Sequence, residues 1–134
     1  MRKDIEFPKV EQVAMAVVLE DNEAGDPTWK AYLLNLKEVA LNNVLIASRG
    51  YGTHEDREVK TSTLRHFVEQ LPGQSYAPIE TIVDNLLGLS NEFWVSFYLD
   101  EKMYDKKYVF LAESITEEHL TTVPLIGKKG IVIM

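Results

Sequence analysis

The chain contains no cysteine. It can therefore form no disulfide framework, no thiolate metal site and no cysteine nucleophile, so any chemistry must come from oxygen and nitrogen groups. Histidine is also scarce, with 3 residues in 134. The sequence has no Gly-x-Ser-x-Gly elbow, and Gly50 and Gly52 lack the third glycine and the lysine of a phosphate-binding loop. We expect neither a cofactor nor a metal ion.

Long hydrophobic runs are missing as well. No stretch approaches the roughly 18 consecutive apolar residues of a membrane helix, and the longest candidate is Val13 to Leu19. The first residues include the basic pair Arg2-Lys3 but no apolar run of the roughly 7 to 15 residues that a secretory signal needs. We therefore expect a cytoplasmic protein that has no membrane partner.

Basic residues are outnumbered, with 14 against 21 acidic ones, which gives a net charge of −7. Binding to phosphate backbones depends on a basic surface that releases counterions, so this composition predicts no nucleic-acid partner. The length suits one hydrophobic core, and we expect a single domain over residues 1–134.

Short segments with alternating or continuous apolar residues fill most of the chain. The clearest runs from Glu92 to Leu99, where Phe93, Val95 and Phe97 face one way and Trp94 and Tyr98 the other. The leucines between Trp29 and Ser48 also permit a helix, but the interspersed asparagines and β-branched residues favour strands. The predicted strands are 13–19, 29–36, 43–48, 59–68, 76–83, 92–99, 107–112 and 130–134.

Turn signals separate these strands. Loops are predicted at Asp21–Pro27, Arg49–Arg57, Leu71–Ser75 and Asp100–Asp105, where glycine, proline and charged residues gather. Residues 37–42 suit a hairpin or a crossover between sheets, and the strand from Tyr76 can finish as a helical turn before Gly88.

Two features near the carboxyl end add to this pattern. Ser114-Ile115-Thr116-Glu117 matches a capping box, which predicts a short helix through Leu120. The uncharged, β-branched run Gly130–Met134 would be prone to aggregate as a free edge, so we expect it to pair within a sheet or with a neighbouring chain.

Seven or eight short strands with little helix predict an all-β fold, an antiparallel immunoglobulin-like β-sandwich with one short helix. Four segments follow the strand and turn rhythm of immunoglobulin-like sandwiches in bacterial proteins, which the chain therefore resembles: Tyr32–Leu36, Asn43–Ile46, Leu71–Ser75 and Phe93–Phe97. Ser48–Tyr51 with Lys60–His66 also resembles a group of small, uncharacterised bacterial proteins. That resemblance implies no known function, and the cysteine pair of antibody domains is absent.

The densest cationic and hydroxyl character lies between residues 49 and 66. Arg49, Tyr51, Lys60, Arg65 and His66 are candidates for a patch that recognises an acidic peptide or another anion, because arginine and tyrosine are favoured at contact surfaces. This patch is the first candidate binding site.

A second candidate surface involves Trp94 and Tyr98, which point away from the predicted core. Either the N-terminal segment or the helix near Ile115 covers them, or they form a self-association surface. Together with Ile131 and Ile133 of the terminal strand, they are the candidate interface residues of a homo-oligomer.

The leading hypothesis is a non-enzymatic protein-interaction module. The alternative is a small metal-dependent or hydrolytic enzyme that uses His54, His66 or His119 with nearby acids. For a serine nucleophile, Ser62 and His66 would lie roughly 13 Å apart on one strand, too far for direct proton transfer. A third hypothesis is an assembly protein that polymerises by exchanging residues 130–134.

Overall fold

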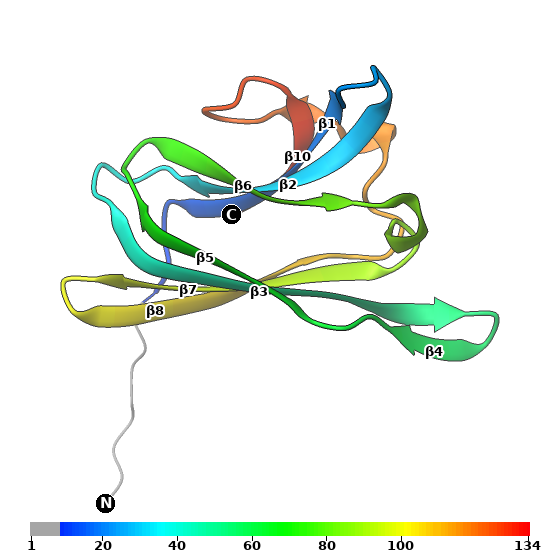
Figure 1. The fold of residues 1–134 in the computed structure, drawn as a ribbon, viewed down its shortest axis with the longest axis horizontal. Coiled ribbons are helices and arrows are strands. Elements are labelled where there is room, and N and C mark those ends of the chain that lie inside the picture. Colours follow the sequence, from blue (N-terminus) through cyan, green and yellow to red (C-terminus); the bar gives the residue numbers. More distant parts are fainter. Residues whose placement is uncertain (1–8) are drawn as a thin grey trace, which may run out of the picture.

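The computed structural model describes residues 9–134 and shows an all-β protein whose strands form two antiparallel sheets, packed face to face (Figure 1). The all-β prediction is confirmed. The described residues form ten strands rather than seven or eight, because the predicted strand 59–68 divides in two and a two-residue strand was not foreseen. None of the helical turns in this part of the chain could span a membrane.

The strands of the first sheet come from the middle of the sequence and from both of its ends. Its order is β6 (Ser75–Ile82), β2 (Pro27–Asn35), β1 (Val13–Asp21), β10 (Lys129–Ile133) and β9 (Thr121–Thr122). The terminal strand β10 pairs with β1, as predicted for a segment that would otherwise be a free apolar edge. The segment that begins at Trp29 is a strand and not a helix.

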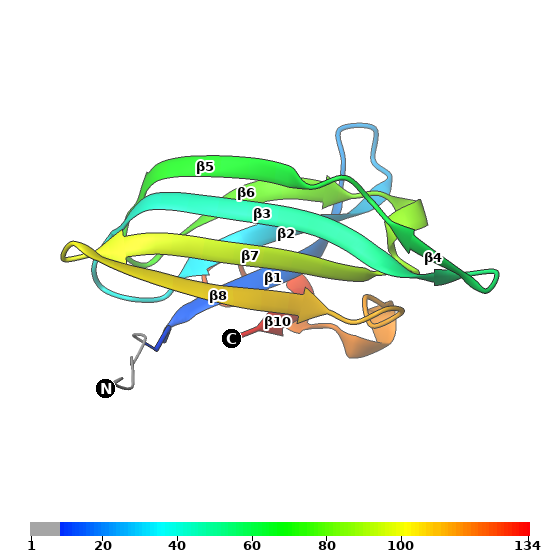
Figure 2. The same ribbon diagram turned by 90° about the horizontal axis from the view of Figure 1, so that it is seen from below.

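The second sheet is seen from its outer side in Figure 2. Its order is β4 (Arg57–Lys60), β3 (Leu41–His54), β7 (Ser90–Leu99) and β8 (Lys102–Phe110), and β5 (Leu64–Leu71) also pairs with β3. The connection at residues 37–42 crosses from β2 in the first sheet to β3 in the second. Of the two predicted connections, the crossover is therefore the one that forms.

The main hydrophobic core lies between the sheets and is built from alternate residues of their strands. Phe93, Val95 and Phe97 of β7 are buried, as their alternation predicts, and the Phe93 and Phe110 rings meet edge to face at 5.9 Å. This contact joins β7 to β8 inside the sandwich.

The outer face of the first sheet carries a second, smaller core. Ala14, Ala16 and Val18 point outward from β1 but are buried, because Val123 and Ile126 of the segment between β9 and β10 pack over them. Small side chains on β1 allow this close cover, so the chain itself closes the outer face of the first sheet over β1.

The predicted loop at 49–57 is wrong, because β3 continues to His54 and only Glu55 and Asp56 form the turn into β4. Both turn residues have positive φ, at 51° and 63°, as the type I′ two-residue hairpin turn requires. Asp100 and Glu101 do the same between β7 and β8, with φ of 48° and 67°. The predicted turn at 100–105 is therefore too long.

The capping-box prediction is also wrong. The helix there is a single 3₁₀ turn, η2 (Glu117–His119), with Thr116 at its N-cap and no side-chain cap. The Ser114 hydroxyl instead donates to the Leu111 carbonyl at 2.6 Å. The helical turn predicted after β6 is present as the 3₁₀ turn η1 (Asp84–Leu86).

Candidate functional site

The outer face of the second sheet brings most of the predicted patch together. Cross-strand pairs fix the arrangement, since Arg65 and Trp94 both pair with Ala47, Arg49 pairs with Glu92, and Tyr51 pairs with Lys60. Paired residues point to the same side of a sheet. We name this surface the recognition face and define it by Leu45, Arg49, Tyr51, Lys60, Arg65, Phe67, Trp94, Tyr98, Met103 and Lys107.

Large apolar and aromatic side chains of the recognition face are open to solvent. Phe67 is 63% exposed and Trp94 47% exposed, and Leu45, Tyr98 and Met103 are exposed with them. They come from four adjacent strands, β5, β3, β7 and β8 (Figure 2). Exposed apolar residues that gather on one face mark interaction surfaces.

The helix expected to cover Trp94 does not do so. Ile115 is buried in the core between the sheets, so its segment packs inside the sandwich and not on the recognition face. The other predicted cover, the N-terminal segment, includes residues 1–8, which lie outside the described part of the chain.

Cations lie on the middle rows of the recognition face, next to its aromatic rings. The Lys107 ammonium lies 5.1 Å from the Trp94 ring, and the Arg49 guanidinium lies 5.3 Å from the Tyr51 ring. Arg65 lies on the same cross-strand row as Trp94 and Lys107. The part of the face around Trp94 therefore combines aromatic rings with exposed positive charge.

Glu92 holds two of these cations in place. Its carboxylate is buried and contacts the Arg49 Nε at 3.1 Å and the Lys107 Nζ at 3.9 Å. The exposed acid Asp105 pairs with Ser96, one cross-strand row from Trp94, and the exposed Glu69 lies further along β5. Close to Trp94, the three positive charges of Arg49, Arg65 and Lys107 exceed the two negative charges of Glu92 and Asp105 by one.

His66 does not join the recognition face, because it neighbours Arg65 on a pleated strand and so points to the opposite side. Its Nε2 lies 2.7 Å from Glu80 Oε1 on β6. The Ser48 hydroxyl, pointing inward from β3, donates to the same Oε1 at 2.6 Å. Ser48, His66 and Glu80 thus join the two sheets where their edge strands β5 and β6 contact each other.

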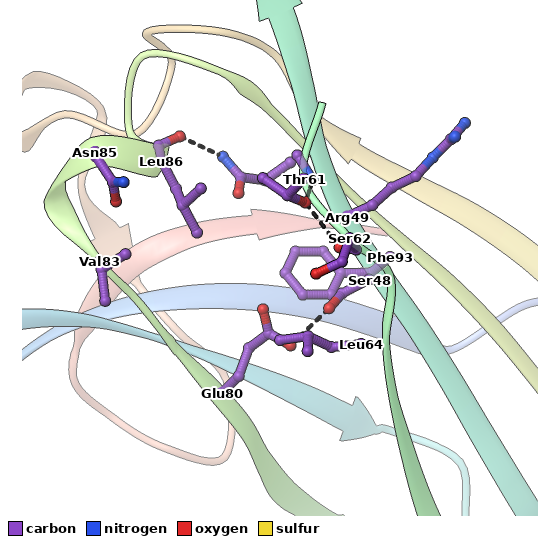
Figure 3. Close-up of a pocket in the computed structure, with 12 residues that line it drawn as sticks. Ser48, Arg49, Thr61, Ser62, Leu64, Glu80, Val83, Asn85, Leu86 and Phe93 are labelled. Carbon is purple, nitrogen blue, oxygen red and sulfur yellow. Dashed lines mark hydrogen bonds between the residues drawn. The ribbon is translucent and has the colours of Figure 1, made fainter. Parts of the chain in front are cut away.

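A cavity of about 220 Å³ lies beside Glu80 (Figure 3). Asn91 fixes one wall by donating to the carbonyls of Leu86 and Leu89 at 2.9 and 3.1 Å. Thr61 fixes another, since its hydroxyl accepts from the Gly50 amide at 2.9 Å. The cavity is lined by Ser48, Arg49, Gly50, Thr61, Ser62, Leu64, Glu80, Val83, Asn85, Leu86, Asn91 and Phe93.

The residues of the enzyme hypothesis lie in three separate places. His54 is near the tip of the β3–β4 hairpin, His66 is at Glu80, and His119 contacts Thr116 and Ser114 in the η2 turn. Across residues 9–134 no three side chains of histidine, aspartate or glutamate are placed to hold a metal ion.

The candidate interface residues also lie in two separate places. Trp94 and Tyr98 are exposed on the recognition face, whereas Ile131 and Ile133 pair with β1 and pack, half buried, against the main core. Sequence reasoning missed Ser48, Glu80, Phe67 and Lys107. Alternation could have placed Phe67 beside Arg65 on the outer face, but the Glu80 contact depends on which strands meet across the sandwich.

A scan against models of known families and a search of curated proteins find no match to this chain.

Proposed function

We propose that the protein is a non-enzymatic, cytoplasmic interaction module whose recognition face binds an acidic segment of a partner protein. The observation that carries the proposal is the group around Trp94, where an exposed indole ring is flanked by Lys107, Arg65 and Arg49. Indole and tyrosine rings supply apolar contact area, and arginine pairs with carboxylates in a two-pronged geometry.

The contrast between the two outer faces supports this choice of surface. Val123 and Ile126 cover the alanine-rich face of β1 in the first sheet, whereas Phe67, Trp94 and Met103 of the second sheet remain open. Apolar side chains exposed to water on one face are unfavourable in free energy, and binding of a partner would remove them from water. An acidic segment that also carries apolar residues could pack against the aromatic rings of the recognition face and pair with its cations.

We also propose that the sandwich is immunoglobulin-like. Strands β6, β2 and β1 follow the order E-B-A of that fold, and β3, β7 and β8 follow the order C-F-G. Two features are variations on this scheme, because β5 pairs with β3 in the second sheet and β10 extends the first sheet beyond β1.

The test selects peptides from a displayed random library on the immobilised protein and measures their affinities by titration. We expect enrichment of aspartate and glutamate next to apolar residues. Arg65→Glu combined with Lys107→Glu should weaken binding at least about tenfold, since each attraction becomes a repulsion, and the loss should shrink at high salt. Trp94→Ala should weaken binding to a similar extent.

A matched control carries the same change in charge elsewhere. Arg57→Glu with Lys102→Glu alters two exposed cations that alternation places off the recognition face. Selected peptides without acidic enrichment, or equal losses in the two double variants, would refute the proposal. Sedimentation of the protein alone is a second readout: a dimer that Trp94→Ala abolishes would identify the face as a contact between copies and overturn the acidic partner.

A further inference from the structure

The cavity beside Glu80 has the size of a site for one small group. At about 220 Å³ it is smaller than the roughly 300 to 1,000 Å³ of pockets that hold drug-sized ligands. Its walls come from β3, from Thr61 and Ser62 between β4 and β5, from Leu64 of β5, from β6, from the η1 turn and from β7 (Figure 3). Since hydrogen bonds of Asn91 and Thr61 hold two of these walls, the cavity is preformed.

Glu80 gives this cavity a negative charge. Arg49 and Glu80 are the charged residues among those that line it, and Figure 3 shows the Arg49 side chain leading away. The Arg49 guanidinium is already engaged by Glu92 and Tyr51 on the recognition face. The charged group that the walls present to the cavity is therefore the Glu80 carboxylate, which His66 contacts at Oε1 from outside the lining.

The Glu80 carboxylate retains capacity for another donor. Ser48 and His66 both contact Oε1, whereas Oε2 has no hydrogen-bond partner within residues 9–134. The side chain is 15% exposed, so much of its hydration has been removed. A partly desolvated carboxylate with a free oxygen gains more from a cationic donor than it would in open water.

The remaining walls favour an organic cation over a hydrated metal ion. Phe93, Leu64, Val83 and Leu86 present apolar surface, and an aromatic ring also attracts a cation placed over its face. A metal ion would need several oxygen ligands, and no cluster of three metal-binding side chains occurs in the described part of the chain. An alkyl chain that ends in an ammonium group matches both the walls and the charge.

We propose that this cavity binds a primary alkylammonium group, with Glu80 as its counter-ion and Phe93, Leu64 and Leu86 around its alkyl chain. Such an alkylammonium group can belong to a free small amine or to the lysine side chain of a protein. The site faces the interior of the sandwich, so the inference stands independently of the recognition face.

The test titrates the ¹⁵N-labelled protein with butylammonium, with the neutral isostere 1-butanol and with pentanoate, and follows backbone amide shifts. We expect saturable shifts at Gly50, Ser62 and Asn85 with butylammonium, and binding at least about tenfold weaker for the other two probes. Equal binding of 1-butanol and butylammonium, or no shifts at these amides, would overturn the proposal.

Variants distinguish a loss of the Glu80 carboxylate from a loss of the fold. Glu80→Gln keeps the side-chain shape and should abolish most of the butylammonium affinity, whereas Glu69→Gln on the outer side of β5 should leave it unchanged. If Glu80→Gln does not fold, Gly50→Ala is the second variant. A Cβ there would lie 3.4 to 3.7 Å from Thr61, Leu89 and Leu86, so it fits while taking up cavity space. Unchanged affinity in the variant that folds would contradict the assignment.

A further arm identifies the source of the ammonium group. A short peptide with one central lysine is titrated beside butylammonium, with norleucine in place of lysine as its control. Binding of both the lysine peptide and butylammonium supports a protein lysine as the ligand, and binding of butylammonium alone supports a free amine. Failure of the peptide selection on the recognition face would leave this result unaffected, since the two assays use different ligands and variants.

Discussion

Asn35 provides the sharpest test of how the two sheets are held together. It is the last residue of β2 and is completely buried. Its Nδ2 donates to the carbonyls of Val39, Leu71 and Pro72 at 2.9, 3.1 and 3.0 Å, and its Oδ1 accepts from the Lys37 amide at 3.0 Å. One side chain therefore ties the β2–β3 crossover to the turn between β5 and β6.

The cost of Asn35→Ala follows from these contacts. The Leu71 carbonyl is buried, and leaving it without a donor costs about 1 to 3 kcal/mol. The partly buried bonds to Val39 and Lys37 each contribute roughly 0.5 to 1.5 kcal/mol. We expect a loss of about 3 to 4 kcal/mol in the free energy of unfolding, a large part of the roughly 5 to 15 kcal/mol of a typical domain.

Urea unfolding followed by circular dichroism measures this loss. With a slope of about 1.5 to 2 kcal/mol/M, the midpoint should fall by about 2 M. Asn35→Asp should cost more than Asn35→Ala, because it directs a carboxylate oxygen at three carbonyl oxygens. Gln70→Ala is the control, since its exposed bond to Asn42 should contribute less than about 0.5 kcal/mol. An Asn35→Ala variant as stable as this control would refute the reasoning.

Two further predictions concern the closed face of the first sheet. Burial raises the pKa of Glu20, but hydrogen bonds from Tyr32 and Lys128 outweigh it and hold the pKa below the ordinary value of a glutamate. The ionised Glu20 therefore stabilises the fold above its unfolded-state pKa, and this contribution disappears as pH falls through its folded-state pKa. The difference in unfolding free energy between wild type and Glu20→Gln should accordingly shrink in an acid titration. Gly130→Ala should lower the melting temperature, because its Cβ would lie 2.5 Å from a backbone oxygen of β1, and overpacking costs about 1 to 3 kcal/mol. Gly88→Ala, where the Cβ meets nothing within 4 Å, should leave the melting temperature unchanged or raise it.

Strands with strict alternation could be predicted from the sequence. In the segment from Glu92 to Leu99, large apolar residues alternate so regularly that one pleat explains both the buried Phe93 and the exposed Trp94. The terminal strand could be predicted for a different reason, since an uncharged β-branched run has few ways to remain folded other than pairing.

The hairpin turns could not be placed from the sequence. Glu55-Asp56 and Asp100-Glu101 adopt positive φ without the glycine or asparagine that usually marks such turns. Charged residues on both sides made these regions resemble long loops. The strand β3 was therefore predicted to end before Arg49, although its pairing with β4 and β7 continues beyond that residue.

The candidate sites show the same limit at the level of side chains. The sequence pattern could group Arg49, Tyr51, Lys60 and Arg65, because strand parity puts them on one side once their register is known. It could not connect His66 to Glu80, since that contact crosses from one sheet to the other and depends on β5 and β6 being neighbouring edges. Contacts within a strand follow from alternation, and contacts between sheets follow from topology.

Strand β3 shows why the two proposals can be tested separately. Arg49 points outward to the recognition face, while Ser48 and Gly50 on either side of it point inward to the cavity. Pairing with β5 and β7 on both sides fixes this alternation, because a shift by one residue would move every side chain to the opposite face. A change at Arg65 or Lys107 therefore alters charge on one face only, and a change at Glu80 alters it only between the sheets.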